Sequence, residues 1–292
     1  MKKKLVAGAV TLLSIVTLAA CANGTNKDVV TMKGDTITVS DFYDEIKTNQ
    51  GAQQVLFQMT INKVFEKEYG SKVSDKEVDK ELAKQKKQLG NQFDAYLAQQ
   101  GLTEETAKKQ IRSNMLLEYA VNQAAKKDIK ESDYKAAFES YTPEVTAQII
   151  KLDSEDKAKE VLEAAKAEGA DFAQIAKDNS TDTATKDKGG EVKFDSGTAD
   201  IPSQVKEAAF KLDENGISDV ITVSAGQNYS ASYYIVKLNK KTEKGSDWKK
   251  YEKRLKEIIV DGRKQDTNYI RSIIAKAMTN ANIKVKDDAF KS

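Results

Sequence analysis

The sequence predicts an α+β protein in which a small antiparallel-sheet domain is inserted between helical N- and C-terminal segments that pack together. Long stretches near both ends repeat apolar residues every three or four positions, which is typical of amphipathic helices. The pattern of the middle segment, residues 144–241, instead predicts a strand, two helices, a strand, a helix and two strands. That order is typical of an α+β unit with an antiparallel sheet. With 2 prolines in 292 residues, few helices are interrupted.

The N-terminus carries a targeting signal. Three lysines precede the apolar run Leu5–Ala20, which would span about 24 Å as a helix, shorter than the ~30 Å hydrocarbon core of a bilayer. We therefore expect a signal peptide over residues 1–20. Cys21, the single cysteine, directly follows two alanines and resembles the lipobox cysteine of bacterial lipoproteins, whose thiol is diacylated and before which the signal peptide is cleaved. The alternative is an ordinary signal peptide that contains a cysteine. Residues 21–29 are expected to be a polar tether.

Residues 30–140 are expected to form a helical N-terminal domain. The segment "MKGDTITVS" predicts a short hairpin before the helices. Ser74 with Glu77 has the spacing of a capping box. The remaining turn, break and cap signals are a hairpin turn at Gly34-Asp35, a helix break at Gly51, and helix N-caps at Ser40 and Thr103.

The C-terminal segment, residues 246–290, predicts one long amphipathic helix running from Ser246 to about Met278. Such an apolar stripe needs a partner, and the N-terminal helical domain is the expected one. The alternative is a self-associating coiled coil, which the imperfect heptad spacing disfavours. The sequence leaves open whether the chain forms a homodimer.

Each element of residues 144–241 has its own signal. The segment "VTAQIIKLD" alternates like a half-buried strand. Ser154 begins one helix, and Asp171 with Gln174 begins another. The segments "EVKF", "NGISDVITV" and "SYYIVKLN" are expected to be strands, and "PSQVKEAAFKL" a helix.

Composition excludes several classes of function. The chain has no histidine, so Ser-His-Asp and Cys-His catalysis and the usual zinc sites cannot be built. It lacks both a phosphate-binding loop of the G-x-x-x-x-G-K-[ST] type and an EF-hand calcium loop. The charges of its 47 basic and 45 acidic residues nearly cancel, so the chain has no strong positive potential that would attract nucleic acid. We therefore expect no cofactor, no metal and no nucleic-acid partner.

Residues 144–241 resemble a parvulin-type peptidyl-prolyl isomerase domain. The matching residues, in order, are Ala170-Asp171-Phe172-Ala173, Ser180-Thr181-Asp182, Gly189-Gly190-Glu191-Val192, Ala208-Ala209-Phe210, Asn215-Gly216-Ile217-Ser218, Val220 and Tyr234-Ile235-Val236. Together with the lipobox and the flanking helices, the whole chain resembles the PrsA-type foldase lipoproteins of Gram-positive bacteria.

The resemblance implies a set of site residues. Parvulins usually carry a histidine in the first strand and another in the last, and here Gln148 and Tyr234 stand in those places. Asp182 matches a position where the family carries cysteine or aspartate. These three are the expected catalytic residues. The expected proline-binding residues are Val192, Ile201 and Val205, the last two standing where the family usually has methionine and phenylalanine.

The expected function is that of an extracytoplasmic foldase that assists secreted proteins after translocation, nominally by prolyl cis-trans isomerisation. Its partners would be unfolded or partly folded secreted proteins, and lipid on Cys21 would hold it on the outer face of the cell membrane. Because both usual histidines are replaced, we expect weak isomerase activity or none. The alternative is a holding chaperone whose parvulin domain is inactive. A solute-binding lipoprotein lacks support, because no two-lobe α/β pattern is present.

Overall fold

The computed structural model describes residues 27–224 and 231–290, and this part of the chain divides into two compact units. The first unit comprises the chain up to Gly70 together with residues from Ala275 onward, and the second comprises Ser71–Ile274. Within the described ranges, no helix is both long enough and apolar enough to cross a bilayer.

The first unit holds a hairpin, two helices and a C-terminal segment. Its elements are β1 (Asp28–Met32), β2 (Asp35–Thr38), α1 (Val39–Ile46), α2 (Gln50–Tyr69) and the last part of α11 (Thr267–Asn280). Strands β1 and β2 pair antiparallel around a turn that contains Gly34, as expected. The expected cap at Ser40 is wrong, because Thr38 caps α1 in a reciprocal capping box with Asp41. The expected break at Gly51 lies slightly earlier, where Asn49 caps α2.

The second unit joins a group of helices to a four-stranded sheet. Its helices are α3 (Asp75–Leu89), α4 (Phe93–Gln99), α5 (Glu104–Lys127), α6 (Glu131–Ser140), α7 (Glu155–Lys166), α8 (Phe172–Asn179), α9 (Ser203–Lys211), α10 (Glu252–Gln265) and the start of α11. Its strands are β3 (Val145–Leu152), β4 (Glu191–Phe194), β5 (Ile221–Ser224) and β6 (Ala231–Lys241). The caps expected at Ser74, Thr103, Ser154 and Asp171 are all confirmed.

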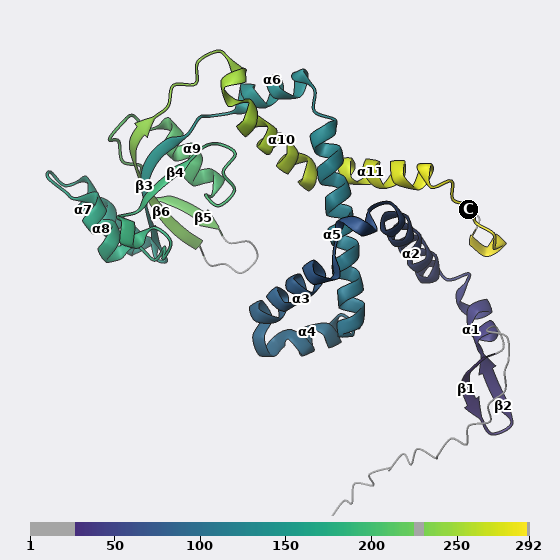
Figure 1. The fold of residues 1–292 in the computed structure, drawn as a ribbon. Coiled ribbons are helices and arrows are strands. Elements are labelled where there is room, and N and C mark those ends of the chain that lie inside the picture. Colours follow the sequence, from purple (N-terminus) through teal and green to yellow (C-terminus); the bar gives the residue numbers. More distant parts are fainter. Residues whose placement is uncertain (1–26, 225–230, 291–292) are drawn as a thin grey trace, which may run out of the picture. The chain divides into compact units, whose positions relative to one another are not determined.

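The sheet has the strand order β4-β3-β6-β5, and every neighbouring pair is antiparallel. Figure 1 shows α7 and α8 on one face of this sheet and α9 on the other. Each face has its own apolar core. Ile150, Phe172 and Ile235 are buried on the α7–α8 face, whereas Ile149 and Val236 are buried on the α9 face. The fold class expected from the sequence is confirmed.

Helix α10 packs against α5 and α6 in the second unit. Arg263 on α10 donates to the Ala125 carbonyl at 2.8 Å and pairs with the Asp133 carboxylate at 2.8 Å. Trp248, just before α10, stacks on Tyr134 of α6 with ring centroids 5.1 Å apart. These contacts hold α10 to the end of α5 and to α6, and no residue of the sheet takes part in them.

The prediction of one continuous C-terminal helix is wrong, because the segment forms two helices. Helix α10 ends at Gln265, and α11 begins at Thr267. Asp266 has an extended backbone, and its carboxylate accepts hydrogen bonds from the amides of Asn268 and Tyr269. Asp266 therefore ends one helix and caps the next. Helix α11 ends at Asn280, so the remainder of the expected 246–290 segment is not α-helical. The domain boundaries inferred from the sequence stay predictions.

Candidate functional site

The α9 face of the sheet gathers the expected proline-binding residues. Val192 of β4 pairs with Ala147 of β3, and its side chain packs with Ile201 against the buried cluster on this face. Val192 and Ile201 are half-buried, whereas Val205 of α9 is completely buried. Of these three side chains, Val192 and Ile201 therefore keep exposed surface, whereas Val205 packs inside the core.

Tyr234 belongs to the same face. It lies on β6, is half-buried, and packs against the α9-side cluster. Its cross-strand partners are Lys151 on β3 and Ile221 on β5. Burial raises the pKa of the Tyr234 hydroxyl, and the carboxylates of Asp182 and Asp153 raise it further. The hydroxyl is therefore a hydrogen-bond donor throughout the neutral range.

Asp182 lies in the loop that follows α8. The preceding Thr181 amide donates to the Lys151 carbonyl at 2.8 Å, so this loop runs beside the strand whose Lys151 pairs with Tyr234. The Asp182 carboxylate accepts from the Thr185 hydroxyl at 2.6 Å and from the Ala184 amide at 3.1 Å. Asp182 thus braces its own loop and also places a negative charge near Tyr234.

Gln148 is directed away from these residues. Successive side chains of a strand point to opposite faces, and Ile149 belongs to the α9-side cluster, so Gln148 lies on the α7–α8 face. Its amide Nε2 donates to the Gly189 carbonyl at 3.0 Å. The structure therefore brings Asp182 and Tyr234 together but does not place Gln148 with them. A network of all three residues is not formed.

The glycine pair after the Asp182 loop serves the backbone. Gly189 and Gly190 have φ angles of +67° and +78°. A methyl group on Gly189 would collide with Ala173 of α8, and one on Gly190 would collide with the backbone of Ile149. The Ile149 amide also donates to the Gly190 carbonyl at 2.8 Å. The pair lets the loop close against β3 and α8.

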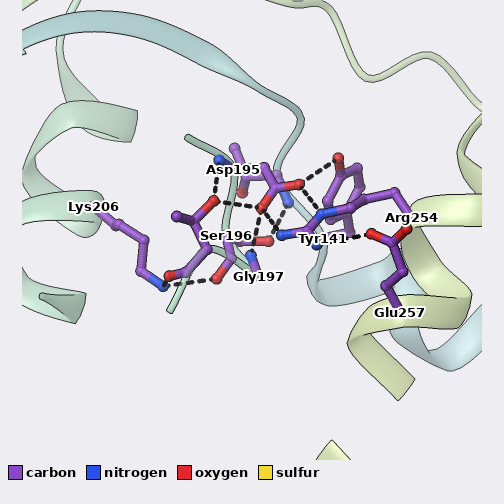
Figure 2. Close-up of polar contacts among 9 residues, drawn as sticks. Tyr141, Asp195, Ser196, Gly197, Lys206, Arg254 and Glu257 are labelled. Carbon is purple, nitrogen blue, oxygen red and sulfur yellow. Dashed lines mark hydrogen bonds and ion pairs between the residues drawn. The ribbon is translucent and has the colours of Figure 1, made fainter. Parts of the chain in front are cut away.

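A buried polar cluster beside this site was missed by sequence reasoning. Asp195, which directly follows β4, has a side chain that is 8% exposed and pairs with Arg254 of α10 (Figure 2). The Tyr141 hydroxyl also donates to the Asp195 carboxylate, at 3.1 Å. Burial raises the pKa of Asp195, but the hydrogen bonds and charge of Arg254, with the hydroxyls of Thr198 and Tyr141, outweigh it and lower the pKa overall.

The first unit presents a different kind of surface. A groove of about 750 Å³ lies between α1, α2 and the C-terminal segment, and its lining is predominantly apolar. Its apolar lining includes Ile46, Val55, Leu56, Met59, Ile283 and Val285. Within the described residues, Tyr96 is the one strongly exposed large apolar side chain that does not belong to this unit.

Two expectations concern other kinds of site. Cys21, the expected lipidation residue, lies outside the described residues. Over residues 27–224 and 231–290, no group of three or more His, Cys, Asp or Glu side chains could hold a metal ion.

Comparisons with known proteins identify the family. The chain is 62% identical over 292 residues to the foldase protein PrsA of Streptococcus sanguinis, a match that covers 100% of this chain and 87% of that protein. The chain belongs to the PrsA foldase family. Residues 141–240 of this PrsA-family protein match the family model of the PPIC-type peptidyl-prolyl isomerase domain, a rotamase.

Solved structures agree with this assignment. The crystal structure of foldase protein PrsA from Streptococcus pneumoniae is 55% identical, with a TM-score of 0.82, and the match covers 90% of this chain and 96% of that chain. The PrsA structure from Lactococcus lactis is 38% identical, with a TM-score of 0.68 and the same coverage of 90% and 96%. The resemblance to PrsA-type foldases with a parvulin domain is confirmed, and family membership supports a foldase role.

Proposed function

We propose that this PrsA-family protein is an extracytoplasmic foldase that accelerates prolyl isomerisation in secreted proteins after their translocation. The observation that carries the proposal is the α9 face of the parvulin sheet. There the half-buried Val192 and Ile201 lie on the same face as Tyr234, a neutral hydroxyl donor. An apolar surface beside one polar donor suits a proline ring and the amide that precedes it.

The chemistry needs no nucleophile. An X-Pro bond rotates over a barrier of about 18–20 kcal/mol, and a catalyst must bind the twisted amide better than either planar form. Val192 and Ile201 hold the proline ring, which leaves the amide as the part that rotates. The Tyr234 hydroxyl then donates a hydrogen bond to the twisted group, and Asp182 holds the loop beside it. Gln148 acts from the opposite face by fixing the Gly189 carbonyl.

The experiment is a proline-limited refolding assay with the mature chain. We expect a measurable acceleration that falls about tenfold when Tyr234→Phe removes the donor. Tyr233→Phe is the matched control, because Tyr233 packs on the α7–α8 face. No acceleration by the unsubstituted chain, or equal rates for both variants, would contradict the proposed chemistry.

We further propose that clients are held on the apolar groove of the first unit. A partly folded client has no fixed shape, and adaptable side chains such as Met59 suit it. Met59 is 55% exposed, so Met59→Asp adds a charge to the groove without disturbing a buried core. We expect this variant to suppress aggregation of an unfolded model protein less well than the unsubstituted chain.

Tyr96→Asp is the control for client holding, because Tyr96 is an exposed apolar residue of the second unit. If the control loses as much aggregation suppression as Met59→Asp, the groove is not the holding surface. Sedimentation of the same samples measures whether the chain forms the homodimer that the sequence leaves open.

The membrane tether through Cys21 completes the proposal. Two acyl chains hold a protein stably at a bilayer, whereas one chain binds only marginally. We expect Cys21→Ala to move the protein from the membrane fraction to the medium or to leave an uncleaved precursor. Unchanged mass and fractionation after the substitution would rule out lipidation at this residue.

A further inference from the structure

Arg254 lies outside the matched isomerase domain of residues 141–240, yet it forms a two-bond ion pair with Asp195 inside that domain. Its Nε donates to Asp195 Oδ2 at 2.6 Å and its Nη2 donates to Asp195 Oδ1 at 2.8 Å, as Figure 2 shows. Two parallel bonds of this kind fix direction as well as distance. Helix α10 therefore holds the carboxylate of Asp195 in one orientation.

The same carboxylate organises the loop that follows it. Asp195 Oδ1 accepts from the Gly197 amide and the Thr198 hydroxyl, both at 3.0 Å, and Thr198 Oγ1 in turn accepts from the Asp195 amide at 3.1 Å. A methyl group on Gly197 would collide with Ile258 of α10, so the loop backbone lies directly on that helix. The loop is thus shaped by Asp195 and seated on α10.

The other side of the loop is fastened to α9. Lys206 Nζ donates to the Ser196 carbonyl at 2.9 Å and to the Thr198 carbonyl at 2.6 Å (Figure 2). Lys206 follows Val205, the buried support of the proposed proline site, and the loop itself leads into Ile201. An unbroken set of contacts therefore runs from Arg254 through the loop to α9.

We propose that Arg254 is a positioning residue for prolyl isomerisation: from α10 it sets the loop between β4 and α9, and with it Ile201, in the arrangement that receives a client proline. This inference rests on the proposed isomerase function. It implies that the isomerase site is completed by a helix outside the isomerase domain. The simpler alternative is that the Arg254–Asp195 ion pair only stabilises the packing of α10 on the domain. That alternative predicts no effect on Ile201 or on isomerisation.

The test compares Arg254→Met, Arg254→Lys and Glu257→Gln in the mature full-length chain. Glu257→Gln is the matched control, because Glu257 binds Arg254 Nη1 at 3.1 Å and makes no bond to Asp195. Two measurements are made without any client: amide hydrogen exchange over residues 195–206, and the NMR signal of the Ile201 side-chain methyl. A third measurement is kcat/KM for isomerisation of a proline-containing peptide.

We expect Arg254→Met to raise exchange over residues 195–206 about tenfold and to shift the Ile201 methyl signal, while exchange in β3 and β6 stays unchanged. We expect kcat/KM to fall about tenfold, because a small displacement of a binding wall is costly in catalysis. Arg254→Lys, which keeps the charge but loses the fork, should give intermediate values, and Glu257→Gln should behave as the unsubstituted chain.

The outcomes separate the two proposals. An unchanged loop and Ile201 signal in Arg254→Met would overturn the positioning role, whatever the activity. A loosened loop with unchanged kcat/KM would overturn it as well. If the unsubstituted chain has no activity, the isomerase function fails, and the client-free exchange and methyl signals still decide whether Arg254 positions Ile201. If Arg254→Met does not fold, the same three measurements are compared between Arg254→Lys and the unsubstituted chain.

Discussion

Asp195 is a buried charge, and protonating its carboxylate lowers the free energy of unfolding. Its pKa in the folded chain is below the ordinary value of 3.8. The stabilisation from its bonds is therefore fully present above the ordinary pKa and is lost as pH falls through the lowered one. We expect Asp195→Asn to cost about 2–3 kcal/mol at neutral pH, because it leaves Arg254 facing a neutral amide.

The check is thermal unfolding of both proteins between neutral pH and about pH 2. The gap in melting temperature should be widest above about pH 4 and should close in acid. A gap that stays constant with pH would show that the loss comes from packing rather than from the ionised carboxylate.

Under the proposed isomerase function, the absence of histidine affects how the rate of isomerisation depends on pH. Histidine is the side chain that ordinarily changes its charge between pH 5 and 8, and this chain has none. The raised pKa of Tyr234 keeps its hydroxyl protonated across the same range. We expect kcat/KM for prolyl isomerisation to be flat between about pH 6 and 9. A bell-shaped profile there would show that a group other than Tyr234 carries the proton that matters.

At the scale of single elements, the glycine pair makes the sheet and the Asp182 loop fit together. Gly190→Ala would combine a positive φ with a collision against the Ile149 backbone, so we expect a loss of about 3 kcal/mol in the free energy of unfolding. Gly169→Ala is the matched control, because Gly169 has a φ of +75° with open space around it, and should cost about 1 kcal/mol. Denaturant unfolding of both variants measures the difference. Equal losses would mean that the backbone contact with Ile149 is not tight.

The sequence predicted the elements whose signals are local. Ser74 with Glu77 lie within one helical turn, so their capping box could be recognised from spacing alone. Asp266 was missed because it interrupts an apolar stripe that continues on both sides, and a single aspartate on a helix's wet face looks the same in sequence. Local signals define where elements exist better than where they end.

Contacts between distant elements could not be predicted in the same way. The register between β3 and β6 shifts between Thr146 and Ala147, and a one-residue shift moves a side chain to the other face. The Gln148–Tyr234 relation does not depend on that shift: Gln148 lies opposite Lys237, which is three residues from Tyr234 on β6, so strand alternation places Gln148 and Tyr234 on opposite faces. Arg254 and Asp195 are 59 residues apart, and neither carries a sequence motif that pairs them. Their contact exists only once the sheet and α10 are packed.

At the scale of the whole molecule, we expect the sheet of residues 144–241 to be a separable insertion between helices, although the sheet and these helices form one compact unit. The Arg263–Asp133 pair and the stacking of Trp248 on Tyr134 hold α10 to α6 independently of the sheet. We expect a chain in which a short Gly/Ser linker replaces residues 144–241 to unfold cooperatively with a helical circular-dichroism spectrum. A broad, non-cooperative transition would show that the helices depend on the sheet for their packing.

Two exposed methionines of the first unit make the protein sensitive to oxidation. Met32 and Met59 are 52% and 55% exposed, and Met59 lines the apolar groove. Oxidation to the sulfoxide turns a flexible apolar side chain into a polar one. Mild peroxide treatment should therefore weaken aggregation suppression, and Met59→Leu should resist that loss while Met32→Leu does not. Because both methionines are exposed and neither belongs to the buried core, oxidation should weaken the proposed client holding before it unfolds the chain.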